Sequence, residues 1–365
     1  MGAALAAPGR GARRGGGPLA AWPRRSRARR RAGARRGAGV PVPGILLAAL
    51  GGLPLGVVLG PEAPLLALGS AVALLLVRPI ARAADPTAQA LLTVAGASAA
   101  LAAIFGSPLV AAIFVLEAVG LAGPKLARVI LPCLLASGVG ALVFTGMGSW
   151  TGLSISSLSL PEVDGPQRPD LGDVLWTVPL AVVIAVGVRQ VHHVGRWVAR
   201  VAERRPAGTA LAAALVVGLC TVAYSLLTGR SPEEVALSGQ GLLEPLVADA
   251  HAWSLAALAA LLVFKSIAYG VSLGALRGGL IFPALLLGAA AGVLVSGLPG
   301  YGVVPAVAAG MAAATASILP FPVSSAVLVI LLLGPNAAAM APVVLIAVVV
   351  AFVFEQVIVK QRRGE

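Results

Sequence analysis

The most constraining feature of this 365-residue sequence is an acidic residue inside an apolar segment. The motif GPEAP at residues 60–64 contains Glu62, and an apolar run follows it to Val77. Proline is favoured in the first turn of a helix, so Pro64 predicts a helix start whose free N–H groups and positive dipole end face Glu62, or an anion in its place. An acid in apolar surroundings is costly, and within membrane segments such acids are usually functional. We therefore identify Glu62 as the principal functional candidate.

The same pattern returns later in the chain without the acid. Residues 279–288 read GLIFPALLLG and match residues 60–69 at both glycines, at the proline and at two leucines. A second block is also repeated, with identical spacings of twelve residues, at Gly96, Pro108 and Gly120 and again at Gly310, Pro322 and Gly334. Two copies of a proline-started short helix predict the repeat architecture of membrane transporters, in which broken helices meet near the middle of the bilayer.

The composition independently indicates a membrane protein. Hydrophobic residues make up 58% of the chain and charged residues 11%, and the 45 glycines suit close packing of helices in lipid. We therefore expect an all-α integral membrane protein with inverted repeats, and neither an enzyme nor a cofactor-binding protein. His192 and His193 are neighbours that point apart on a helix, so we expect no metal site there.

The net charge of +13 belongs mainly to the N-terminal tail. Residues 1–40 hold eleven arginines and no acidic residue or lysine. Three interpretations remain open: an arm that binds anionic lipid or nucleic acid, a disordered segment that its charge holds on the cytoplasmic side, or a mis-translated stretch. Trp22 is the one aromatic residue among them, and no folded nucleic-acid-binding motif accompanies the arginines, so we expect no nucleic-acid partner.

Charge and apolar runs divide the chain into five parts. Four arginines between 196 and 205 favour the cytoplasmic side, so the preceding polar loop should face outward. The expected parts are an Arg-rich tail (1–42), a truncated first membrane repeat (43–147), a polar extracellular loop (148–170), a second membrane repeat (171–358) and a cytoplasmic tail (359–365). The first repeat has one apolar segment before its motif and the second has three, so about two segments are missing from the front.

The order of four motifs resembles the CLC chloride channel and transporter family over roughly residues 43–358. The motifs are GPEAP, FGSPLVAAIFVLE from residue 105, RGGLIFPALLLG from residue 277, and AGMAAATASILPFPVSSAVLVILLLG from residue 309. The resemblance implies a bacterial-type plasma-membrane protein in the lipid bilayer, with chloride or another small anion as substrate. It also implies a homodimer whose contacts come from about 107–147 and 321–358.

By the same resemblance, Glu62 matches the gating glutamate of the family. Helix N-termini attract anions without a full positive charge that would trap the ion. The anion-binding positions we expect are Gly60, Pro61, Ala63, Gly279, Leu280, Ile281 and Phe282.

Several positions depart from the family pattern. Pro61 replaces a basic residue, Ala63 replaces a glycine, and the aromatic residue of the second motif is shifted by one position to Phe282. Ala118 occupies the position of the inner proton-transfer glutamate, and we expect Glu117 to be a structural acid paired with backbone donors. The serine motif of the family is absent, and no tyrosine occurs near residue 363.

We therefore expect channel-like or weakly coupled anion conduction gated by Glu62. The alternatives are a non-conducting, N-terminally truncated remnant and, if the missing front is restored, a proton-coupled chloride antiporter. Lys265 also interrupts an apolar run, where it either snorkels to the interface or attracts anions.

Overall fold

The computed structural model describes residues 51–52, 56–77, 86–120, 124–151, 160 and 168–363. The chain divides into residues 1–38 and a compact unit of residues 39–365, and every described residue belongs to that unit. The expected Arg-rich tail therefore lies outside the described residues. So do the start of the first repeat and most of the expected loop at 148–170, although the first four residues of that loop are helical.

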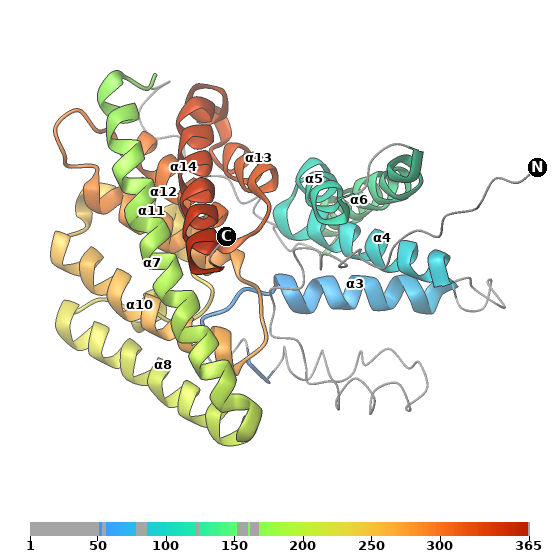
Figure 1. Ribbon diagram of the computed structural model, residues 1–365, viewed down its shortest axis with the longest axis horizontal. Coiled ribbons are helices and arrows are strands. Elements are labelled where there is room, and N and C mark those ends of the chain that lie inside the picture. The colour runs from blue at the N-terminus through green and yellow to red at the C-terminus, as the bar shows by residue number, and fades with distance from the viewer. Residues whose placement is uncertain are drawn as a thin grey trace, which may run out of the picture. The chain divides into compact units, whose positions relative to one another are not determined.

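The described part of the chain is helical and contains no strand (Figure 1). Among the described residues, the first four helices with defined bounds are α3 (Glu62–Val77), α4 (Pro86–Phe105), α5 (Pro108–Val119) and α6 (Pro124–Thr151). The next four are α7 (Leu171–Arg204), α8 (Pro206–Thr228), α9 (Gln240–Ala248) and α10 (Leu255–Ala275), and the last four are α11 (Ile281–Val295), α12 (Val303–Ile318), α13 (Pro322–Leu332) and α14 (Ala337–Arg363). Short 3-10 turns lie at Pro232–Glu234, Ala250–Ala252 and Gly334–Asn336.

The two repeated motifs form equivalent helices. Helix α3 begins at Glu62 and α11 at Ile281, each two residues before the proline that we expected to start it. Proline is tolerated at this third position because N–H groups of the first turn have no acceptor within their own helix. The prolines thus mark the right turn, although the helix extends two residues further toward the N-terminus.

Matched glycines explain why each repeat packs as it does. A Cβ atom on Gly69 of α3 would lie 2.4 Å from the carbonyl oxygen of Gly96 in α4. The equivalent atom on Gly288 of α11 would lie 2.3 Å from the carbonyl oxygen of Gly310 in α12. Each repeat therefore brings two backbones into contact where any larger residue would separate them.

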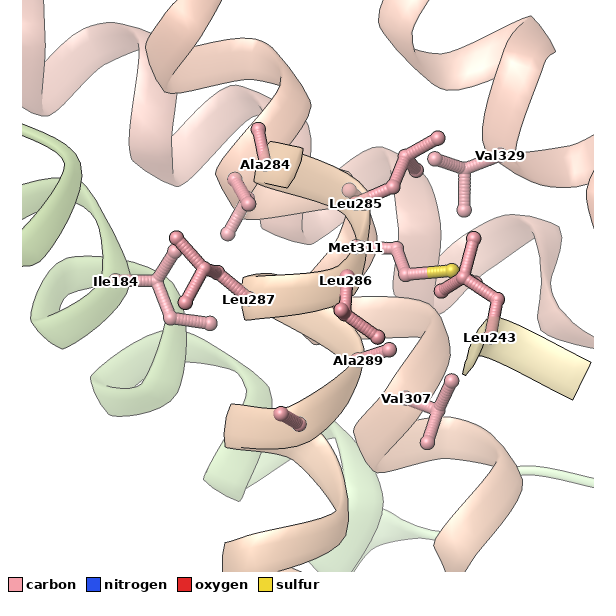
Figure 2. Close-up of a cluster of buried hydrophobic side chains, with 14 of the residues drawn as sticks. Ile184, Leu243, Ala284, Leu285, Leu286, Leu287, Ala289, Val307, Met311 and Val329 are labelled. Atoms are coloured by element: carbon pink, nitrogen blue, oxygen red, sulfur yellow. The ribbon is translucent and has the colours of Figure 1, made fainter. Parts of the chain in front are cut away.

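Helix α11 is the centre of the core. All of its residues from Ile281 to Ala290 are buried, as expected for a helix that is apolar all round. Figure 2 shows Leu287 beside Ile184 of α7, while Met311 of α12 lies near Leu243 of α9. Such a position holds the first turn of α11 rigidly.

Six of the described helices contain segments long and apolar enough to cross a membrane. The segments are Ala88–Phe105, Leu126–Phe144, Leu171–Arg204, Pro206–Thr228, Leu255–Ala275 and Gly334–Ile358. Five shorter apolar helices, among them α3, α5, α11 and α13, accompany them. The expected all-α membrane architecture with short broken helices and two inverted repeats is confirmed.

Candidate functional site

The two motifs meet through their first glycines. The Gly60 N–H donates to the Gly279 carbonyl at 3.0 Å, and the Gly279 N–H donates to the Gly60 carbonyl at 2.6 Å. This antiparallel bridge brings the starts of α3 and α11 together. A Cβ atom on Gly279 would come within 1.3 Å of Glu62 Oε2, so only glycine leaves room for that carboxylate.

Glu62 reaches from the first turn of α3 to the first turn of α11. Its Oε1 atom accepts hydrogen bonds from the N–H groups of Ile281 at 3.2 Å and Phe282 at 3.0 Å. The residue is 2% exposed, and among the described residues its Oε2 atom has no hydrogen-bond partner. The carboxylate therefore lies at the N-terminus of α11, where backbone N–H groups and the helix dipole favour negative charge.

The backbone groups of the other residues that we expected to bind an anion have different partners. Gly60 and Gly279 use their N–H groups in the bridge between them. Pro61 has no N–H, and its carbonyl accepts from the N–H of Leu65. Ala63 is exposed in the first turn of α3. The Leu280 carbonyl accepts a hydrogen bond from Tyr269. The N–H groups that donate to Glu62 are those of the next two residues, Ile281 and Phe282.

A row of aromatic rings leads away from this site. Phe282 packs against Phe105 with ring centroids 5.8 Å apart, and Phe105 stacks on Phe114 at 6.0 Å. Phe114 meets Phe321, which precedes α13, in an edge-on contact at 6.2 Å. Phe282 is fully buried, so the aromatic residue fills the core although it is shifted by one position in the motif.

Glu117 lies at the far end of that row and caps α13. Its Oε1 atom accepts from the Val323 N–H at 3.1 Å, and its Oε2 atom accepts from the Ser324 N–H at 2.7 Å and hydroxyl at 2.6 Å. The expected pairing of Glu117 with backbone donors is confirmed. Ala118 is the next residue of α5 and packs against the hydrophobic core.

Two buried polar residues of α10 hold segments near the site. Tyr269 was not identified in the sequence, and Lys265 was interpreted as a residue that either snorkels or attracts anions. The Tyr269 hydroxyl donates to the Leu280 carbonyl at 2.6 Å. Lys265 is 0% exposed and therefore does not snorkel; its ammonium donates to backbone carbonyls between Glu234 and Leu237. In the sequence, the spacing of four residues between Lys265 and Tyr269 already indicates that the two polar side chains share one face of an apolar helix.

A further polar network supports the turn that Lys265 contacts. The Arg230 guanidinium binds both oxygens of Glu234, at 3.0 and 2.9 Å, and stacks 3.5 Å from the ring centre of Trp253. The Tyr224 hydroxyl donates to Glu234. Among the described residues, no group of three or more metal-ligating side chains is assembled.

Comparison with known proteins agrees with this geometry. The family model described as voltage gated chloride channel matches residues 34–356. A slow cyanobacterial Cl⁻/H⁺ antiporter is similar with a TM-score of 0.68 and 18% identity, over 88% of this chain and 77% of the other. A CLC-type fluoride/proton antiporter gives a TM-score of 0.62 and 18% identity, over 85% and 73%. No curated protein sequence matches the chain. Because the family match spans most of the sequence, the chain belongs to the voltage-gated chloride channel family of anion-transporting membrane proteins.

Proposed function

We propose that this protein conducts chloride or a similar small anion, with Glu62 as the gate. The observation that carries the proposal is the pair of hydrogen bonds from Ile281 and Phe282 to the Glu62 carboxylate. A site that binds one buried carboxylate through backbone donors offers a permeating anion the same donors once the carboxylate leaves. Protonation removes the charge that holds Glu62 there, so acidification opens the site.

The N–H donors suit permeation because they bind without trapping. Partial charges at a helix N-terminus replace part of the hydration shell of an anion, and conduction requires binding weak enough for release. Arg277 precedes Gly279 by two residues, and the buried Lys265 uses its ammonium on backbone carbonyls. We attribute the attraction at the site to the start of α11, where the N–H groups of Ile281 and Phe282 bind the Glu62 carboxylate.

We further propose that conduction is channel-like or only weakly coupled to protons. Ala118 has no titratable group, and the adjacent Glu117 is engaged at the start of α13. Proton-coupled antiport is the second candidate, because the two similar solved structures are a Cl⁻/H⁺ antiporter and a fluoride/proton antiporter. Chloride is the expected ion, and nitrate and fluoride are the competitors to test.

Liposome flux measurements test the gate. Glu62→Gln mimics the protonated side chain, so we expect anion flux to become high and nearly independent of pH, whereas the wild-type flux rises as pH falls. Glu233→Gln is the matched control, because Glu233 is an exposed acid in a 3-10 turn outside the site. An unchanged pH profile in Glu62→Gln would assign Glu62 a structural role. Absence of flux in every variant would favour the non-conducting alternative.

We also infer that the protein is a homodimer. The segments 107–147 and 321–358 carry exposed apolar side chains on α5, α6, α13 and α14, including Leu135 at 71%, Leu142 at 72% and Val349 at 57% exposed. Small residues within these segments suit close helix contact in lipid. Crosslinking in native membranes should give a dimer band, and a monomer at every protein-to-lipid ratio would exclude this assembly.

A further inference from the structure

One face of α10 contacts the second motif directly and reaches the first motif through an intervening turn. Lys265 and Tyr269 are four residues apart, so they lie on the same side of the helix, one turn from each other. They are 0% and 1% exposed, respectively. Burying an ammonium and a phenol is costly unless both are hydrogen-bonded. Tyr269 bonds to the second motif itself, and Lys265 bonds to a turn that is in turn hydrogen-bonded to Gly56, ahead of the first motif.

Tyr269 acts on the second motif through one peptide group. Its hydroxyl donates to the Leu280 carbonyl at 2.6 Å. That carbonyl and the N–H of Ile281 belong to the same planar peptide, so holding the oxygen fixes the direction of the N–H. The N–H is one of the two donors to Glu62. Tyr269 therefore aims a donor at Glu62 without forming a hydrogen bond to the carboxylate.

Lys265 acts on the first motif through the turn at residues 234–237. Its ammonium lies 3.0 Å from the carbonyl oxygens of Glu234 and Val235, and 3.3 and 3.5 Å from those of the next two residues. Leu237 ends this turn, and its N–H donates to the Gly56 carbonyl at 3.3 Å. Gly56 lies four residues before Gly60, so the turn fixes the chain where it approaches the site.

The conformation of Leu237 supports this reading of Lys265. Leu237 has a φ of +59° and is the single non-glycine residue with positive φ among those described. Such a conformation persists only where surrounding contacts determine it. The four carbonyls directed at one ammonium supply those contacts.

We propose that Tyr269 and Lys265 are positioning residues that set the geometry of the anion site from one helix. Tyr269 orients the donor peptide of α11, and Lys265 orients the segment that carries Glu62. This inference deepens the proposed function and rests on it for its biological meaning, but its geometry can be tested without transport.

Infrared titration of purified protein tests the proposed role of Tyr269. The protonated carboxyl band of Glu62 is assigned by its loss in Glu62→Gln, and its midpoint is then measured in Tyr269→Phe. Tyr269 itself is the titratable side chain that faces Glu62 from α10. A hydrogen bond to the charged form favours ionisation, so freeing the 280–281 peptide should move the midpoint to higher pH, by roughly one unit or less.

Tyr301→Phe is the matched control for that experiment. Tyr301 is 5% exposed and lies in the connection between α11 and α12, beside Thr177 and Asp173 of α7. Its variant loses the same hydroxyl from a buried site, and we expect the wild-type midpoint. A wild-type midpoint in folded Tyr269→Phe would overturn the proposed role of Tyr269.

Hydrogen exchange tests the proposed role of Lys265. In Lys265→Met, amide exchange should accelerate both in the turn at 234–237 and at residues 56–62, while the 298–302 connection keeps its wild-type rates. If Lys265→Met does not fold, Lys265→Arg replaces it, because a planar guanidinium cannot reproduce the four contacts of a compact ammonium. Unchanged amide exchange at residues 56–62 would overturn the proposed role of Lys265. Failure of the proposed function is distinguishable, since it appears as absent flux in wild-type liposomes whatever these two measurements give.

Discussion

At the residue level, the site depends on the absence of a methyl group at Gly279. An alanine there would place its Cβ atom 1.3 Å from Glu62 Oε2, and the bridge to Gly60 prevents the backbone from moving away. Gly279 does not have a positive φ, so the position of the acid, and not the backbone conformation, requires a glycine there. Gly60 is subject to the same constraint, because a Cβ atom there would lie 1.9 Å from Glu62 Oε2.

Gly279→Ala should therefore expel the Glu62 carboxylate from its position. We expect anion flux to lose most of its pH dependence, as in Glu62→Gln, with overpacking that costs roughly 1–3 kcal/mol of stability. Flux in liposomes and thermal unfolding in detergent measure the two effects. Gly297→Ala is the control, because a Cβ atom there meets nothing within 4 Å. A Gly279→Ala protein with wild-type pH dependence would contradict the steric explanation.

At the level of elements, two acids of the first repeat cap two short helices of the second. Glu62 binds the first turn of α11, and Glu117 binds the first turn of α13. Helix α13 has no side-chain cap of its own, and Pro322 removes the first donor, so the available N–H groups are those of Val323 and Ser324. The two repeats are joined by charge-to-dipole contacts as well as by apolar packing.

Replacing Glu117 should destabilise the contact between α5 and α13. We expect Glu117→Ala to cost roughly 1–3 kcal/mol, since it leaves two backbone N–H groups and the Ser324 hydroxyl unpaired. The stability of Glu117→Gln, which keeps one acceptor oxygen, should fall between those of the wild type and Glu117→Ala. Denaturant unfolding in mixed micelles measures the change, with the exposed Glu203→Ala on α7 as control. Equal stability of Glu117→Ala and wild type would show that water replaces the cap.

At the level of the whole molecule, the open question is whether protons move with the anion. A proton needs titratable groups or water from the inner face to Glu62, because it does not cross hydrocarbon unaided. Ala118 provides no such group. If position 118 faces the proton route, Glu117 should project away from that route, because adjacent helical residues differ by about 100° in direction. Its carboxylate oxygens are held at the start of α13.

We therefore predict that a chloride gradient will not drive protons uphill. The measurement is the internal pH of vesicles with the membrane potential clamped by a potassium ionophore. Sustained proton movement at a fixed ratio to chloride would refute the uncoupled interpretation. If none occurs, Ala118→Glu is informative, because a gain of weak coupling would place position 118 on a proton route.

The sequence by itself determined the class of the protein and the elements of its site. Apolar composition, repeated glycines and prolines, and one acid before a helix predict inverted membrane repeats with Glu62 at a helix start. These are local signals, because they depend on hydropathy, on the missing N–H of proline and on the small size of glycine.

Only the tertiary structure decided which groups meet. Local rules place Glu62 at the start of its own helix, whereas its hydrogen bonds are made to Ile281 and Phe282, more than two hundred residues away in the sequence. Likewise, an isolated lysine in an apolar run reads as a snorkelling or anion-attracting residue until four carbonyls converge on Lys265. The energy of a buried polar group depends on the partners that folding supplies, and a single sequence does not specify them.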